Sequence, residues 1–178
     1  MSFAIPARLA TATAAYRPHL VTAYITYLDL QKATAPDVEL DASYTSVLIQ
    51  SGDHPLLARF APRWQQAVAA PKLNAGDWYA VAMLDGDRVF GHFWVTTTSL
   101  HGIANGVPNL RLGPDEAFGW DLYLDPEYRR GKIGLWAARI TIETLRDMDK
   151  KIGYTHLVHD NAGSVLWHHG IGFNWVQV

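Results

Sequence analysis

A basic, glycine-containing turn between an apolar segment and an amphipathic one carries the clearest chemical signal in the sequence. Pro126 follows the apolar residues 122–124 and ends any strand there, because it has no N–H for a ladder. Residues 128–134 then hold three cationic side chains and two glycines, and from Ile133 to Leu145 apolar residues recur at roughly helical spacing. The turn therefore lies at a helix N-terminus, where free N–H groups, the helix dipole and nearby cations favour an anion. A pyrophosphate fits best; glycines that only shape the turn, with solvated arginines, would give the same pattern.

A second polar segment follows a predicted strand at residues 155–159. Asn161 comes soon after that strand, Ser164 lies three positions further on, and residues 172–173 are Gly-Phe. Because Asn161 lies where a strand ends and a helix begins, its side chain suits a helix N-cap as well as a contact to a ligand.

Together the two segments resemble the GNAT superfamily of acyl-CoA-dependent N-acyltransferases. In that family a strand ending Val-x-Pro precedes Arg-x-x-Gly-x-Gly/Ala at the start of a helix. Residues 124–126, Leu-Asp-Pro, are similar to the first part, and Arg129, Lys132 and Gly134 fall on the Arg and the two Gly positions.

The later motif of the family is Asn-x-x-Ser-x-x-Leu-Tyr-x-x-x-Gly-Phe. It is met at Asn161, Ser164 and residues 172–173 with small offsets, and Trp167 stands where the family has Tyr. The resemblance covers residues 77–178. We therefore expect a single GNAT-like domain over residues 1–178, in which residues 1–76 form a less typical, helical N-terminal part.

The resemblance implies acetyl-CoA, or another acyl-CoA, as cosubstrate. Main-chain amides at the helix start would cradle its pyrophosphate, and exposed main chain of the preceding strand would pair with its amide-bearing pantetheine arm. The cofactor-binding residues implied in this way are Leu122, Tyr123, Leu124, Arg129, Arg130, Gly131, Lys132, Ile133, Gly134, Leu135, Asn161, Ser164 and Trp167.

Lys132 departs from the family pattern at the first Gly position. If the backbone there needs a positive φ, or if CoA needs close approach, Lys strains or widens the turn. If φ is negative, Lys costs little and can add a charge-assisted contact to a phosphate. We favour the second interpretation.

Direct acyl transfer from a thioester to an amine requires three events: the amine loses a proton, the carbonyl is polarised, and the thiolate is reprotonated. Asp121 is the leading candidate for the base, directly or through a water. It is opposite in phase to Leu122 and Leu124 along the strand and in phase with Tyr123. It could therefore face the substrate cleft or a solvated edge.

The proton donor to the thiolate is less clear. An indole N–H at Trp167 is no useful proton donor at neutral pH. Either no residue donates the proton, or another residue or a water molecule does. His168 is the candidate replacement, although neighbouring helical residues point about 100° apart. Second candidates for the base are His159, Asp160 and Glu116.

The remaining histidines carry little signal. His92, His101 and His156 are interpreted as ordinary polar surface or loop residues. The histidines lack the spacing of a metal site, so no metal is predicted.

Composition narrows the function classes. The 178 residues are 49% hydrophobic and 18% charged with a net charge of −2, which suits one domain with a full core and gives no general attraction to nucleic acid or membrane. There is no cysteine, which excludes disulfides and a thiol nucleophile, and no apolar run near the ~20 residues of a membrane span. We expect a cytoplasmic protein, and a homodimer is left open.

The order of predicted elements gives the fold class. We expect an α/β (α+β) fold, with a mixed, mostly antiparallel central sheet and helices on both faces.

A hairpin at residues 78–96 with Asp-Gly at its turn is the sharpest local prediction. Residues 99–115 are expected to be a long, functional loop. The strands are expected at residues 2–5, 44–49, 117–124, 155–159 and 173–177. The helices are expected at residues 18–33, 55–70 with a break or a new helix start at Pro62, 133–151 (ended by Gly153) and 162–169.

Three functions are compatible with these observations. The first is an N-acyltransferase acting on a primary amine of a small molecule or peptide. The second is a GNAT-fold protein that binds acyl-CoA or a partner without turnover, which the changes at Lys132 and Trp167 favour. The third is an acyltransferase with a longer-chain or carrier-protein donor, whose acyl tail would occupy an aromatic pocket.

Overall fold

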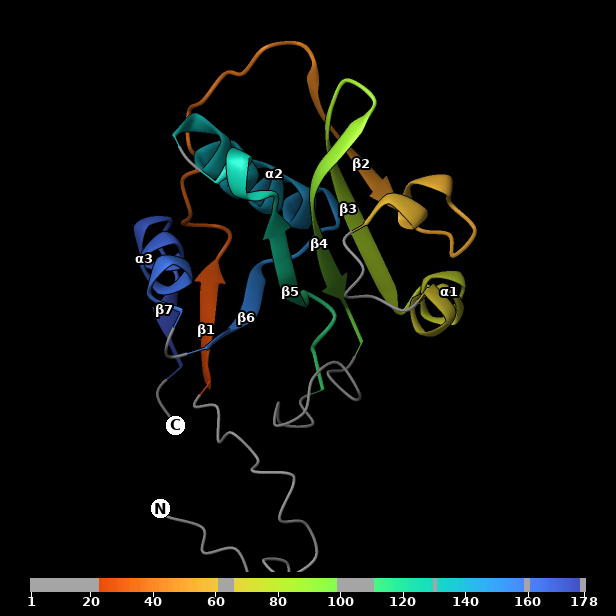
Figure 1. Ribbon diagram of the computed structural model, residues 1–178. Helices are drawn as coiled ribbons and strands as arrows, with labels where there is room; N and C mark the ends of the chain where they lie inside the picture. The colour runs from red at the N-terminus through yellow and green to blue at the C-terminus, as the bar shows by residue number, and fades with distance from the viewer. Residues whose placement is uncertain (1–22, 61–65, 99–110, 130, 159–160, 177–178) are drawn as a thin grey trace, which may run out of the picture.

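The computed structural model describes residues 23–60, 66–98, 111–129, 131–158 and 161–176. Its centre is a seven-stranded sheet in the order β2-β3-β4-β5-β6-β1-β7 (Figure 1). Neighbouring strands are antiparallel except for β5 and β6, which are parallel. The strands are β1 (Ala23–Asp29), β2 (Tyr44–Ile49), β3 (Trp78–Asp85), β4 (Arg88–Thr96), β5 (Glu116–Leu124), β6 (Ile152–Val158) and β7 (Asn174–Trp175). The helices are η2 (Pro55–Arg59), α1 (Gln66–Asn74), η3 (Pro126–Tyr128), α2 (Lys132–Asp147) and α3 (Ala162–Gly170).

The predicted helix at residues 18–33 is wrong, because residues 23–29 form strand β1. This strand pairs with β6 on one side and with β7 on the other, so an N-terminal strand lies between two C-terminal ones. Thr26 and Leu28 are buried while Ile25 and Tyr27 are half-buried, which is the two-residue period of a strand. A short apolar run fits both periods, and its β-branched and aromatic residues favour a strand once β6 offers a ladder. The expected strand at residues 2–5 lies outside the described residues.

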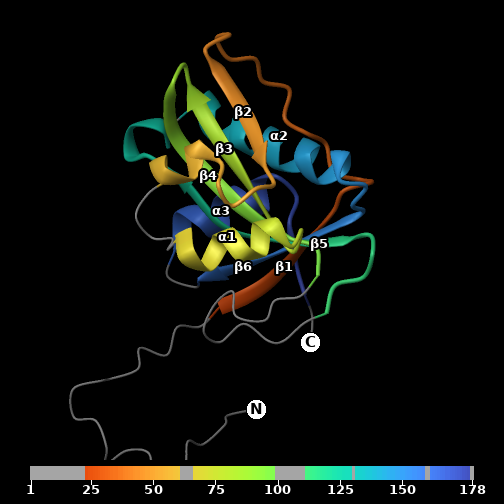
Figure 2. The ribbon, with the colours of Figure 1, turned by 90° about the vertical axis from the view of Figure 1, so that its right-hand side faces the viewer.

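Two hydrophobic cores lie on opposite faces of the sheet. One contains α2, through Trp136, Ala137 and Ile142, and the other contains η2 and α1, through Leu57 and Leu73. Figure 2 shows α1 and α2 on opposite sides of the sheet. The predicted mixed, mostly antiparallel sheet with helices on both faces is confirmed.

The hairpin is also confirmed. β3 and β4 pair from Trp78↔Thr96 to Asp85↔Arg88, and Gly86 at the turn has φ 57°, which glycine adopts without strain. The extended segment predicted at residues 44–49 is strand β2.

One predicted helix is interrupted and another is shorter than expected. The helix predicted over residues 55–70 is interrupted, in agreement with the break expected within it, since η2 ends at Arg59, Phe60 is extended and α1 begins at Gln66; Pro62 itself lies outside the described residues. α2 ends at Asp147, and Asp149 takes the left-handed conformation with φ 56°. Gly153 does not cap the helix. It lies in β6, where a Cβ atom would meet Leu145 at 3.0 Å, so its small size allows close packing of β6 on α2.

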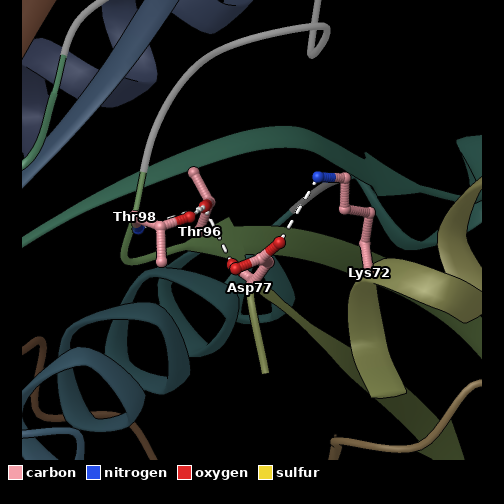
Figure 3. A network of polar contacts seen from close by, with 4 residues as sticks. All are labelled: Lys72, Asp77, Thr96 and Thr98. Atoms are coloured by element: carbon pink, nitrogen blue, oxygen red, sulfur yellow. Dashed lines mark hydrogen bonds and ion pairs between the residues drawn. The ribbon is translucent and has the colours of Figure 1, made fainter. Parts of the chain in front are cut away.

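A polar network fixes α1 to the far end of the hairpin (Figure 3). The buried Thr96 hydroxyl donates to the Asp77 carbonyl oxygen over 2.9 Å, and the Thr98 amide donates to the Thr96 hydroxyl. Lys72, near the end of α1, lies 3.3 Å from the Asp77 carboxylate. α1 is thereby held where it covers the second core. In the part of the chain that the structure describes, no helix is long and apolar enough to cross a membrane.

Candidate active site

The sheet opens between β5 and β6. Their parallel pairing runs from Glu116↔Ile152 to Gly119↔Thr155 and stops there, although both strands continue. Beyond Gly119, β5 pairs only with β4 among the described strands. From this point onward no described strand pairs with the edge of β5 that faces β6.

Asp121 lies just beyond the last pair, at a bulge in β5. Trp94 is paired with Trp120 and His92 with Tyr123, so two residues of β5 oppose one residue of β4. Asp121 has φ 50°, a left-handed conformation in which Asp is among the better tolerated residues. Bulges of this kind re-aim a side chain and are common beside active sites. Here the side chain of Asp121 is turned towards β4.

His92 is the partner that Asp121 meets. Its Nε2 atom is 3.5 Å from Asp121 Oδ2, and the side chain is 1% exposed against 18% for Asp121. The imidazole is stacked between Phe60, at 4.5 Å between ring centroids, and Tyr123, at 5.5 Å. The interpretation of His92 as a surface or loop residue is wrong. The only indication in the sequence that His92 is buried is its position inside an apolar strand. That position does not predict which residue His92 contacts.

Two more histidines approach the opening from the other side. His156, on β6, is the first residue after the last pair with β5; its ring is parallel to Phe118 at 5.9 Å, and its Nδ1 is buried without a hydrogen-bond partner among the described residues. Burial lowers the pKa of His156, and the charge of Asp121 acts against that change. The reading of His156 as an ordinary surface or loop residue therefore also fails.

His168, on α3, is buried. Its Nδ1 atom is 2.7 Å from the Ser164 carbonyl oxygen and 3.3 Å from the Ser164 hydroxyl. Burial lowers its pKa, the bond to Ser164 opposes this, and nearby His156 lowers the pKa further. The structure thus gathers Asp121, His92, His156 and His168 from four neighbouring elements.

The basic turn begins α2 at the end of β5. Gly131 precedes the helix with φ 65° and ψ −138°, a conformation open almost only to glycine, and no side chain among the described residues caps it. Lys132 is the first helical residue and has no positive φ, so Lys causes no strain there. The free N–H groups of the first turn are left for an anion.

Arg129 reinforces the other side of the turn. Its Nε donates to the Leu124 carbonyl oxygen over 2.7 Å, and its guanidinium lies over the Tyr123 ring at 5.6 Å. The end of β5 and the start of α2 are thereby held together. Arg130 lies outside the described residues.

No family model and no curated protein sequence matches this chain, whereas several solved structures share its architecture. One is a tandem GNAT protein from the clavulanic acid biosynthesis pathway. The alignment covers 96% of this chain and 56% of the chain of that protein, at 18% identity and TM-score 0.57. The second is a GCN5-related N-acetyltransferase from Kribbella flavida, for which the alignment covers 85% of this chain and 53% of the chain of that protein, at 12% identity and TM-score 0.55. The third is an aminoglycoside acetyltransferase from an uncultured soil metagenomic sample, for which the alignment covers 75% of this chain and 90% of the chain of that protein, at 12% identity and TM-score 0.57.

The chain has the GNAT fold. It spans about half the length of the first two of these structures.

Within this GNAT fold, Trp167 joins two helices. Its indole N–H donates to the Gly134 carbonyl oxygen over 3.0 Å, and a Cβ atom on Gly134 would lie 3.7 Å from the same nitrogen. The indole therefore ties α3 to the first turn of α2. Asn161 accepts a bond from the Ser164 amide over 3.1 Å and is the N-cap of α3, as one of its two sequence interpretations had it.

A groove of about 590 Å³ lies beside the turn. It is lined by Leu135 of α2, the end of β1 with Lys32, and the residues that follow α3. Leu135 is 47% exposed. An extended ligand leaving the helix N-terminus would find apolar surface there, beside the ion pair of Lys32 with Asp29.

Among the remaining candidates, Glu116 is described and is not brought to the opening. Glu116 lies at the start of β5, where its carboxylate accepts bonds from the Tyr154 hydroxyl and the Gly113 amide. His101, His159 and Asp160 lie outside the described residues. Among the residues that are described, no group of three His, Asp or Glu side chains could hold a metal ion.

Proposed function

We propose that this GNAT-fold protein transfers an acyl group, most simply acetyl, from coenzyme A to a primary amine. The observation that carries the proposal is the position of Asp121. Its carboxylate, held by His92, lies where β5 and β6 part, on the strand that leads directly to the uncapped N-terminus of α2. The proposed proton acceptor and the proposed anion site are thus joined by the part of β5 that lies beyond its last pair with β6.

That arrangement matches the parts of an acyl-CoA. The amides of the first turn of α2 would bind the pyrophosphate, and Lys132 adds a positive charge beside it. The pantetheine arm would run along residues 122–124 of β5, where an amide-bearing chain can pair as an added strand. The thioester would then reach the opening near Asp121. The groove at Leu135 offers room for the rest of the ligand.

The chemistry follows from the groups at the opening. Asp121 takes a proton from the attacking amine, directly or through a water, and so keeps nitrogen nucleophilic. His92 is too deeply buried to meet a bulky substrate and acts by holding the carboxylate in place. No covalent intermediate on the enzyme is required, which suits a chain without cysteine.

The acceptor would approach from the face of the sheet that carries α1. Phe60, His92 and Tyr123 stack on this side, beside a core that contains Trp78, Trp94 and Trp120. One of the similar structures is an aminoglycoside acetyltransferase, which supports a small-molecule amine as acceptor.

The alternative is a GNAT-fold protein that binds acyl-CoA without turnover. The bond from Trp167 to Gly134 favours it, because the indole has a structural role and gives the thiolate no proton. Two measurements separate the alternatives.

Calorimetric titration with acetyl-CoA and with free CoA tests binding, and a thiol-release assay over a panel of primary amines then tests turnover. We expect saturable binding and amine-dependent release of CoA. Binding without release for any amine would leave the binder as the function; no binding would remove both.

A further inference from the structure

The reaction leaves a thiolate that must regain a proton, and His156 is placed to provide it. Trp167 is engaged with Gly134, and His168 is buried with its Nδ1 against the Ser164 carbonyl oxygen. His156 is only half-buried, and it is the first residue of β6 beyond the last pair with β5. It therefore lies on the wall of the opening that faces Asp121.

The ring of His156 is held in a fixed plane but its Nδ1 is not satisfied. Phe118 lies parallel to it at an interplanar angle of 3°, while Nδ1 is buried without a hydrogen-bond partner among the described residues. A buried polar atom of this kind is costly unless a partner arrives. A substrate group that hydrogen-bonds to Nδ1 during the reaction would explain why this atom is left without a partner among the described residues.

We propose that His156 relays the proton of the amine from Asp121 to the departing CoA thiolate. This inference rests on the proposed acyl transfer and assigns the second proton-transfer residue of the same site.

The proton count balances without a further reagent. As the C–N bond forms and the C–S bond breaks, the amine proton passes to the Asp121 carboxylate. Asp121 then protonates one ring nitrogen of His156, and the N–H of the other nitrogen gives its proton to sulfur. His156 is left as its other tautomer, and exchange with water restores it after the products leave. The net change is amine plus thioester to amide plus thiol.

The surroundings of His156 favour a neutral ring that can accept one proton and give another. Burial keeps the pKa of His156 below its ordinary value, whereas the charge of Asp121 on β5 opposes this. His168 on α3 is also held neutral by burial. His92 on β4 lies behind Asp121, and Tyr123 on β5 stacks on its ring.

Two variants test the relay. His156→Phe preserves stacking on Phe118 and removes both nitrogens; we expect unchanged CoA affinity and a turnover number lower by about 10² or more. His156→Ala leaves space for added imidazole, which should restore turnover in a saturable way. 1-Methylimidazole has only one free ring nitrogen, so it cannot take up a proton at one nitrogen while giving one from the other, and it should restore less. His169→Ala is the matched control, because His169 is exposed on α3 and should leave turnover unchanged.

The experiments distinguish failure of the relay from failure of the proposed acyl transfer. If the wild-type protein releases no CoA with any amine, both proposals fall. If the wild-type protein is active and His156→Phe retains its turnover, only the relay falls. Equal rescue of His156→Ala by imidazole and 1-methylimidazole would also overturn the relay, since a second free ring nitrogen would then not be needed.

Discussion

The Nε2 atom of His92 lies 3.5 Å from Oδ2 of Asp121, so β4 and β5 are joined by a polar contact at the bulge where the sheet begins to open. Gly91 permits this approach, because a Cβ atom there would lie 2.8 Å from the Tyr123 carbonyl oxygen. The contact links the proposed base to a buried residue that substrate does not reach.

Replacing Asp121 with Asn should abolish most turnover. Asn tolerates the left-handed conformation of residue 121 about as well as Asp, so the variant removes the charge without new strain. We expect a turnover number lower by roughly 10² to 10⁴ and an unchanged dissociation constant for CoA. Steady-state thiol release and calorimetry measure the two quantities. Full activity in this variant would show that Asp121 is not the base.

Replacing His92 with Phe should lower turnover without preventing folding. Phe fits the stack between Phe60 and Tyr123 but removes the polar contact of His92 with Asp121. A poorly held base costs about 10-fold to 100-fold in turnover, while KM for the acyl donor should stay the same. His92→Gln, whose side-chain amide can donate a hydrogen bond to the carboxylate, should recover part of the loss. Equal activities of the two variants would mean that His92 acts through packing alone.

Replacing Gly131 with Ala should weaken both the fold and CoA binding. The backbone at residue 131 has φ 65° and ψ −138°, and a side chain in that region costs roughly 1 to 3 kcal/mol. Gly134→Ala is the matched control for stability alone: a Cβ atom there makes an ordinary contact with Trp167 at 3.7 Å, and Ala favours the helix. Denaturant unfolding of both variants, and CoA titration of Gly131→Ala against the wild type, check the two effects. A Gly131→Ala protein as stable as the wild type would refute the conformational requirement.

Reversing the charge of Lys132 should weaken CoA binding. Lys132 begins α2, where a negative side chain would lie beside the proposed pyrophosphate site. Lys132→Glu should lower affinity about tenfold or more, equivalent to about 1.4 kcal/mol, and Lys132→Gln should lower it less. The difference should shrink at high salt. Identical affinities for the three proteins would remove the turn from the binding site.

Stability should fall on mild acidification, partly because of His168. Burial sets its folded-state pKa below the ordinary 6.5, so between those two values the unfolded chain binds more protons than the folded one. The free energy of unfolding should therefore decrease as the pH falls from about 6.5 through the folded-state pKa. His168→Leu should show a shallower decrease over the same interval. Parallel curves for the two proteins would contradict a buried neutral His168.

Local patterns in the sequence determined much of the C-terminal part of this fold. Asp-Gly specified the hairpin turn, Pro126 specified the end of β5, and the helical period after the basic turn specified the start of α2. Each of these signals acts between residues a few positions apart, where backbone conformation follows from the residues themselves.

Only the tertiary structure decided β1 and the partners of Asp121. Residues 23–29 become a strand because β6, more than a hundred residues later, supplies the ladder. Asp121 meets His92 because a bulge changes the register between β5 and β4, and His156 faces the opening because β6 leaves β5 one residue earlier. Strand pairing and register depend on contacts between distant segments, which local residue patterns do not encode.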